Sequence, residues 1–106
     1  MQKDVIFSEQ RDCLTAHIQR DLDHHSAKSI REQIDRRLFE TRPSVLVIDF
    51  TKVEFMDSSG LGLILGRVEK ASALGAEVLV SGASPTLMKL IRLSGIERVR
   101  HLSVVK

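Results

Sequence analysis

The chain has 106 residues, a formal net charge of +2 at pH 7 and 4% aromatic residues, with no tryptophan or tyrosine. This length predicts one domain, and a hydrophobic content of 42% is sufficient for a core without cross-links. The weak charge and the few aromatics argue against direct nucleic-acid binding, and no apolar run approaches the ~20 residues of a membrane span.

The N-terminal part of the chain predicts a hairpin followed by a helix. We expect strands over residues 5–7 and 13–18, joined by a polar turn. The second stretch alternates apolar and polar side chains, as a half-buried strand does. Apolar residues then recur at spacings of three and four, which predicts an amphipathic helix over residues 24–39. Asp23 is the expected N-cap of this helix, since its side chain can accept free backbone N–H groups.

The central part predicts a buried strand that leads into a second helix. The near-continuous apolar run at residues 45–50 is typical of a central strand covered on both faces. A second amphipathic helix is predicted over residues 60–74. Its expected inward stripe consists of Leu61, Ile64, Leu65, Val68 and Ala71.

The C-terminal part predicts one more strand–helix pair and a short final strand. A strand is expected over residues 77–81, and Ser84-Pro85 has the cap and first-turn proline of a helix start. Gly95 is expected to end that helix, and residues 99–105 to supply the last strand. The sequence contains no internal repeat and no linker, so we expect a single domain over residues 1–106. The order of strands and helices predicts an α/β fold with helices on a partly parallel sheet.

Two features bear on the compartment. Cys13 is the only cysteine, so an intrachain disulfide is impossible, which fits a reducing environment. The first four residues lack the basic and then apolar layout of a secretory signal. We therefore expect a cytoplasmic protein.

The stretch from Asp57 to Gly62 is the main candidate for function. It places a carboxylate, two hydroxyls and a glycine near a helix N-terminus, where orphan N–H groups and the helix dipole favour oxygen atoms and anions. The stretch is either an ordinary helix cap or an exposed corner that another protein can modify. Ser59 is the better N-cap candidate of the two serines, which would leave the hydroxyl of Ser58 free.

Gly62 and Gly66 are four residues apart within the second predicted helix. Glycine inside a helix destabilises it by about 1 kcal/mol relative to alanine, so the presence of two such residues calls for an explanation. One reason is close packing inside the protein. The other is a flat docking strip formed with Leu63 and Arg67, in which Leu63 would be exposed.

Signals for an enzyme or a metal site are weak. His24 and His25 are adjacent, so on a helix they point about 100° apart and cannot easily bind one ion. Ser58 lacks the glycine-flanked elbow of a hydrolase nucleophile. The segment from Gly60 to Gly62 is too short for a dinucleotide fingerprint, and no P-loop lysine follows it. We therefore expect no catalysis, cofactor or metal.

Two segments carry a resemblance to a known family: Phe55-Met56-Asp57-Ser58-Ser59-Gly60-Leu61-Gly62 and Asp21-Leu22-Asp23-His24-His25. With them the chain resembles the anti-sigma factor antagonists of the STAS domain superfamily, in particular the sporulation anti-sigma-F members. The likeness extends from about residue 5 to about residue 102. It implies a mixed sheet of about five strands with three or more helices packed against it.

The resemblance also implies a partner-switching role. The unmodified protein would bind an anti-sigma factor that is also a serine kinase, and so release a sigma factor. That kinase would phosphorylate Ser58, and a phosphatase would restore the serine. Together with the glycine strip, the expected partner-binding residues are Asp23, Asp57, Ser58, Ser59, Gly60, Gly62, Leu63, Gly66 and Arg67.

Two departures from the family and two alternatives stay open at this stage. Arg20 replaces a usual glycine, and the sequence ends at Lys106, where relatives commonly continue into another helix. We expect Arg20 to change the first loop, and the ending at Lys106 to affect stability or oligomeric state, with a monomer as the expectation. The alternatives are a STAS-type module of another partner-switching circuit, such as a stress response, and a small nucleotide-binding or hydrolytic enzyme.

Overall fold

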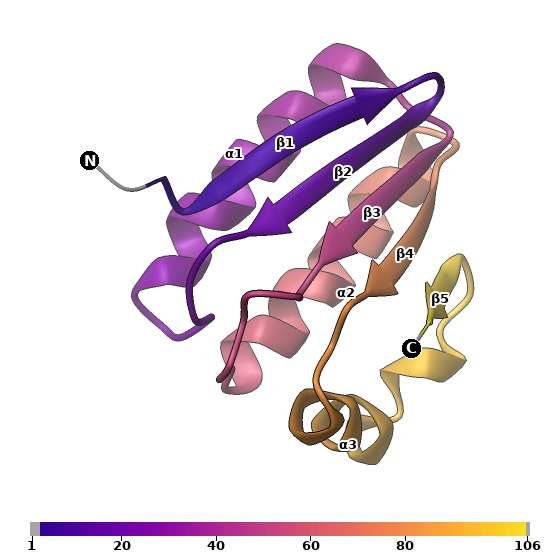
Figure 1. Cartoon of the computed structure of the whole chain (residues 1–106). Helices are drawn as coiled ribbons and strands as arrows, with labels where there is room; N and C mark the ends of the chain where they lie inside the picture. Colours follow the sequence, from indigo (N-terminus) through magenta and orange to yellow (C-terminus); the bar gives the residue numbers. More distant parts are fainter. Residues whose placement is uncertain (1–2, 106) are drawn as a thin grey trace.

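The computed structural model describes residues 3–105, which form one mixed sheet of five strands with helices beside it (Figure 1). In chain order the elements are β1 Val5–Gln10, β2 Cys13–Ile18, α1 Ser26–Thr41, β3 Val45–Asp49, α2 Ser58–Ala73, β4 Glu77–Ser81, α3 Pro85–Ser94, the 3-10 helix η1 Ile96–Arg98 and β5 Leu102–Val104.

The strands follow the sequence across the sheet, in the order β1-β2-β3-β4-β5. The β1–β2 hairpin is antiparallel, and the other neighbouring pairs are parallel. Because parallel strands end at the same edge of a sheet, the loops after β2, β3 and β4 lie at one end of the molecule. The predicted α/β order is therefore confirmed.

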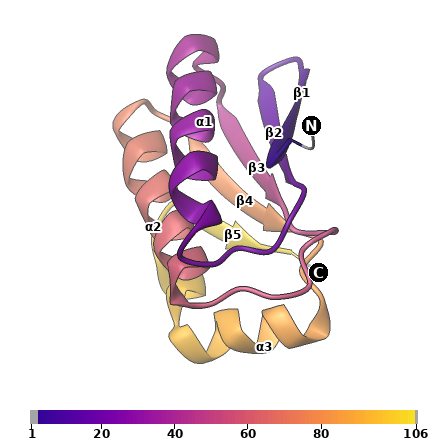
Figure 2. The same cartoon turned by 90° about the vertical axis from the view of Figure 1, so that its left-hand side faces the viewer.

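Helices α1 and α2 lie side by side on one face of the sheet, and α3 lies at the carboxyl end of the parallel strands (Figure 2). The strand residues that face α1 and α2, such as Leu14 and Leu46, are buried. The alternate residues, such as Thr15 and Val47, face the other side and are half-buried. The prediction that β3 is covered on both faces is wrong, because both long helices pack on the same side.

Local chemistry sets the helix ends. Ser84 Oγ accepts the Leu87 N–H at 3.2 Å at the start of α3, and Gly95 ends that helix in the left-handed conformation (φ 79°), as predicted. Helix α1 begins at Ser26, two residues later than predicted, and the N–H groups of His25 and Ser26 donate to the Asp23 side chain. Within residues 3–105 no helix combines the length and apolarity needed to cross a bilayer.

Candidate functional site

The loops that precede α1 and α2 are joined to each other. Leu22 N–H donates to the carbonyl of Phe55, and Asp57 N–H donates to the carbonyl of Leu22, each at 3.1 Å. These bonds make an isolated parallel bridge between Leu22 and Met56, both of which are buried. The carboxylate of Asp21 accepts two further N–H groups of the second loop, at 2.9 and 3.1 Å. The two loops therefore form one rigid corner.

Asp23 caps the first turn of α1. Its Oδ1 atom accepts the N–H groups of His25 and Ser26 at 2.8 and 2.9 Å. The hydrogen bond from Ser26 is the main cause that lowers the pKa of Asp23, because it stabilises the ionised carboxylate. The Asp23 side chain thus accepts free N–H groups as predicted, but the N-cap position of α1 is His25 rather than Asp23. The half-buried side chain of Asp23 sits on the joined corner.

Asp57, rather than Ser59, is the N-cap of α2. Its Oδ1 atom accepts the Ser59 N–H at 2.7 Å, and the helix begins with Ser58. The expectation that Ser59 would be the cap is wrong, because the longer carboxylate one position before Ser58 reaches that N–H first. Ser58 is exposed, Ser59 is half-buried, and the Ser58 hydroxyl makes no hydrogen bond with the residues that the structure describes.

The three glycines at the start of α2 have different surroundings. A Cβ atom at buried Gly60 would lie 2.7 Å from the sulfur of Met56, so close packing explains this glycine. At Gly62 and at Gly66 an added Cβ would meet nothing within 4 Å. Neither has a positive φ. The fold therefore gives no reason for these two glycines, and internal packing is excluded as their explanation.

Leu63 and Arg67 are not on the surface. They are 3% and 2% exposed, whereas Leu65 of the predicted inward stripe is 38% exposed. The prediction of a flat strip with an exposed Leu63 is wrong. A helix that packs against both a sheet and a neighbouring helix buries a wider and shifted arc, which the spacing of apolar residues alone does not show.

Arg67 joins α2 to α1 through an ion pair. Its Nε atom lies 2.8 Å from Oδ1 of Asp35, and Lys70 lies 3.8 Å from the other carboxylate oxygen. Burial lowers the pKa of Arg67, Asp35 opposes this, and the nearby charge of Arg31 lowers it further. The contact with Asp35 is close but misaligned for a hydrogen bond, and Nη1 of Arg67 is buried without a partner. One carboxylate thus faces several cations.

A groove of about 580 Å³ lies between the N-terminal ends of the two helices, and we call it the α1–α2 groove. Its walls include His25, Lys28 and Arg31 from α1, and Ser59 and Gly62 from α2. The sequence contained a signal for the basic wall, since Lys28 lies three residues after His25 and Arg31 three after Lys28. No role was assigned to Lys28 or Arg31 from the sequence.

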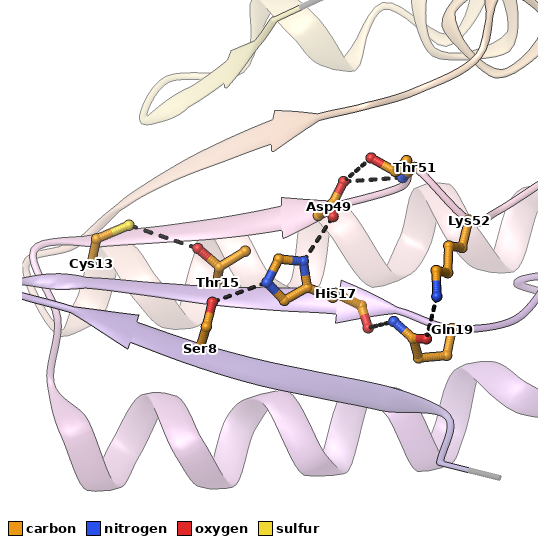
Figure 3. A network of polar contacts seen from close by, with 8 residues as sticks. All are labelled: Ser8, Cys13, Thr15, His17, Gln19, Asp49, Thr51 and Lys52. Atoms are coloured by element: carbon orange, nitrogen blue, oxygen red, sulfur yellow. Dashed lines mark hydrogen bonds and ion pairs between the residues drawn. The ribbon is translucent and has the colours of Figure 1, made fainter.

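A second polar cluster lies on the sheet face that carries no helix (Figure 3). His17 bridges Ser8 Oγ, at 2.9 Å from Nε2, and Asp49 Oδ2, at 2.8 Å from Nδ1. Burial of Asp49 opposes ionisation, but hydrogen bonds from Thr51 and His17 outweigh it and lower the pKa of this carboxyl. Sequence analysis missed this cluster, since it depends on the strand register.

The Ser8–His17–Asp49 cluster has the order of a catalytic triad without the rest of a hydrolase site. Acyl transfer needs N–H donors aimed at the developing oxyanion. Strand N–H groups lie in the plane of the sheet, toward neighbouring strands, and not above the hydroxyl of Ser8. The cluster therefore orders the open face of the sheet, and we assign it no catalysis. In residues 3–105 no three metal-ligating side chains come together.

The family model described as the STAS domain matches residues 4–104, nearly the whole length of the chain. The chain belongs to the STAS domain family. This STAS domain is 30% identical, over 93% of its length and 85% of the relative's, to the anti-sigma F factor antagonist of Paenibacillus polymyxa.

Two solved structures of SpoIIAA share the fold of this STAS domain. The anti-sigma factor antagonist SpoIIAA in its unphosphorylated form is 25% identical, with a TM-score of 0.72 over 96% of this chain and 87% of that one. The Bacillus cell fate determinant SpoIIAA in the phosphorylated form is 27% identical, with a TM-score of 0.71 over 96% and 91%. The predicted family and the predicted mixed sheet with three helices are confirmed.

Proposed function

We propose that this STAS domain is an anti-sigma factor antagonist. In its unphosphorylated form it binds an anti-sigma factor that is also a serine kinase, and a sigma factor is released. Phosphorylation of Ser58 by that kinase switches the protein off. The names of the relatives support the partner-switching role. The observation that carries the assignment to Ser58 is an exposed hydroxyl on the first residue of α2, on a corner fixed by the joined loops.

The position of Ser58 suits a charge switch that leaves the fold intact. A phosphate adds roughly −1.5 to −2 charges at neutral pH, and a helix N-terminus tolerates such charge. The same charge beside Asp57 opposes a partner surface built for a neutral hydroxyl. Each ~1.4 kcal/mol lost at the interface weakens binding tenfold, so a few such losses make a switch.

Ser58 is a better kinase substrate than Ser59. A kinase needs the acceptor hydroxyl free and outside the protein, and Ser58 is exposed, whereas Ser59 is half-buried. The backbone N–H of Ser59 is also tied to Asp57 in the helix cap. Phosphorylation of Ser59 would therefore disturb the cap, whereas phosphorylation of Ser58 adds charge outside it.

The proposed partner surface differs from the one that the sequence suggested. It keeps Asp23, the residues from Asp57 to Ser59, and the two open glycines, Gly62 and Gly66, whereas Gly60 is buried against Met56 and lies outside it. Leu63 and Arg67 are buried, so in this proposal they hold α1 against α2 instead of touching the partner. The joined corner brings Asp23 and Ser58 into one surface, although they come from different loops.

We further expect a cytoplasmic monomer, with a phosphatase that removes the phosphate from Ser58. A sigma factor and its regulators work inside the cell, and an exposed corner is as accessible to a phosphatase as to a kinase. Size-exclusion chromatography with light scattering measures the oligomeric state, and a dimer would contradict this expectation.

The decisive experiment combines site mapping with binding. The protein is incubated with a candidate anti-sigma kinase and ATP, and mass spectrometry locates the phosphate; Ser58→Ala removes the site, and Ser59→Ala is the matched control. Affinity for the partner is then measured for Ser58→Ala and Ser58→Glu. We expect phosphate on Ser58 alone and weaker binding by Ser58→Glu. Phosphate only on Ser59, or equal and tight binding by both Ser58 variants, would refute the assignment.

A further inference from the structure

In the part of the chain that the structure describes, the cations of the α1–α2 groove form no ion pair with a carboxylate. Lys28 and Arg31 are exposed cations on its α1 wall, next to His25. Three carboxylates near them have other partners: Asp23 accepts N–H groups at the start of α1, Asp57 accepts one at the start of α2, and Asp35 pairs with Arg67. The groove is therefore suited to an anion.

Arg67 strengthens the positive potential at the inner end of the groove. It follows Leu63, which lines the groove, by one helical turn, and it feels the charge of Arg31. Its Nη1 atom is buried without a hydrogen-bond partner. Glu32, the remaining acid on this part of α1, lines a different depression further along the helices. The described residues that line the groove include Lys28 and Arg31 and no acidic side chain.

Ser58 does not line this groove but adjoins residues that do. It precedes Gly62 by four residues, so the two share a face of α2, with Cβ positions that would be about 5–6 Å apart. Ser59, the next residue, lines the groove itself. Gly62 has no side chain and its surroundings are open to 4 Å, so on that side of α2 the short side chain of Ser59 is the one beside Ser58.

We propose that the α1–α2 groove is an anion site whose occupant is the phosphate carried by Ser58. In the unmodified protein the same cations contact acidic side chains of the anti-sigma partner. Phosphorylation then releases the partner by filling the site from within the chain, in addition to repelling it. This proposal rests on Ser58 as the phosphorylated residue, and it names Lys28 and Arg31 as the side chains that bind the phosphate.

The first test needs no partner. Phosphoserine is installed at position 58 during synthesis, and its second pKa is followed by ³¹P NMR. We expect the pKa to lie about half a unit or more below that of phosphoserine in the unfolded chain, because nearby cations favour the dianion. The double variant Lys28→Gln/Arg31→Gln should remove most of the shift. The matched control Lys89→Gln/Arg92→Gln, on exposed cations of α3, should retain it.

The second test is a double-mutant cycle on partner affinity. Ser58→Glu is combined with Lys28→Gln/Arg31→Gln, and each protein is titrated with the anti-sigma factor. If the groove binds both the partner and the phosphate, loss of its cations weakens binding of the anti-sigma factor about tenfold. Ser58→Glu then lowers the affinity further by a smaller factor than it does in the natural background. Equal losses in both backgrounds, or a ³¹P shift unchanged in the double variant, would overturn the groove proposal while the switch at Ser58 stands. A failure of the anti-sigma factor to bind at all would instead refute the proposed function, whereas the NMR result would still decide the groove.

Discussion

Gly62→Ala should make the fold more stable and the complex weaker. Gly62 lies inside α2, where glycine costs about 0.8–1.0 kcal/mol relative to alanine. A Cβ there meets nothing within 4 Å, so no clash offsets this gain. For a domain of this size, 1 kcal/mol corresponds to roughly 4–8 °C in melting temperature. The new methyl group stands at the wall of the α1–α2 groove, where it should hinder a docked partner.

The assay compares three alanine variants of one helix by thermal unfolding and by partner titration. Gly66→Ala, also in open surroundings, should raise the melting temperature by a similar amount. Gly60→Ala should not, because its Cβ would lie 2.7 Å from the sulfur of Met56. If Gly62→Ala lowers the melting temperature, or raises it without any effect on partner affinity, then the glycine does not serve docking and the reasoning fails.

Three further predictions concern the charges and turns around the site. Asp35→Asn should lower the free energy of unfolding in urea by about 2–3 kcal/mol, because it removes the charge that pairs with the buried guanidinium of Arg67. The Asp35 side chain is itself only 25% exposed. An unchanged unfolding midpoint would contradict this. The pKa of Asp49 is lowered on folding, so its contribution is full above about pH 4 and is lost as pH falls through the folded pKa. The stability difference between the natural protein and Asp49→Asn should therefore shrink in acid, and a difference that grows there would refute the assignment. Gly82→Ala should destabilise by more than about 1–2 kcal/mol, since its φ is +74° and its Cβ would collide with Thr51; a neutral result in urea would show that the turn can rearrange.

The sequence predicted the elements whose ends depend on local chemistry. Ser84, Pro85 and Gly95 bound α3 as expected, because a cap, a fixed φ and a left-handed residue act within one turn. Asp23 was identified for the same reason. The exposure of Ser58 was also expected, but from a cap at Ser59, whereas the structure places the cap at Asp57 and still leaves Ser58 exposed.

Features that depend on packing were not predictable in this way. The burial of Leu63 and Arg67 follows from the position of α1, which the spacing within α2 does not contain. The His17 cluster requires the register that sets β1 beside β2 and β2 beside β3. The bridge between Leu22 and Met56 joins segments more than thirty residues apart in the chain, so the local sequence around either residue does not predict it.

That bridge has a consequence for how new partners can be recognised. Because the backbones before α1 and α2 are fastened to each other, Asp23 and Ser58 keep a constant separation whatever side chains surround them. In the proposed switch, changes in the groove residues alter which protein is bound without moving Ser58. Related circuits in one cell then diverge in partner choice while they retain the proposed phosphate-controlled release.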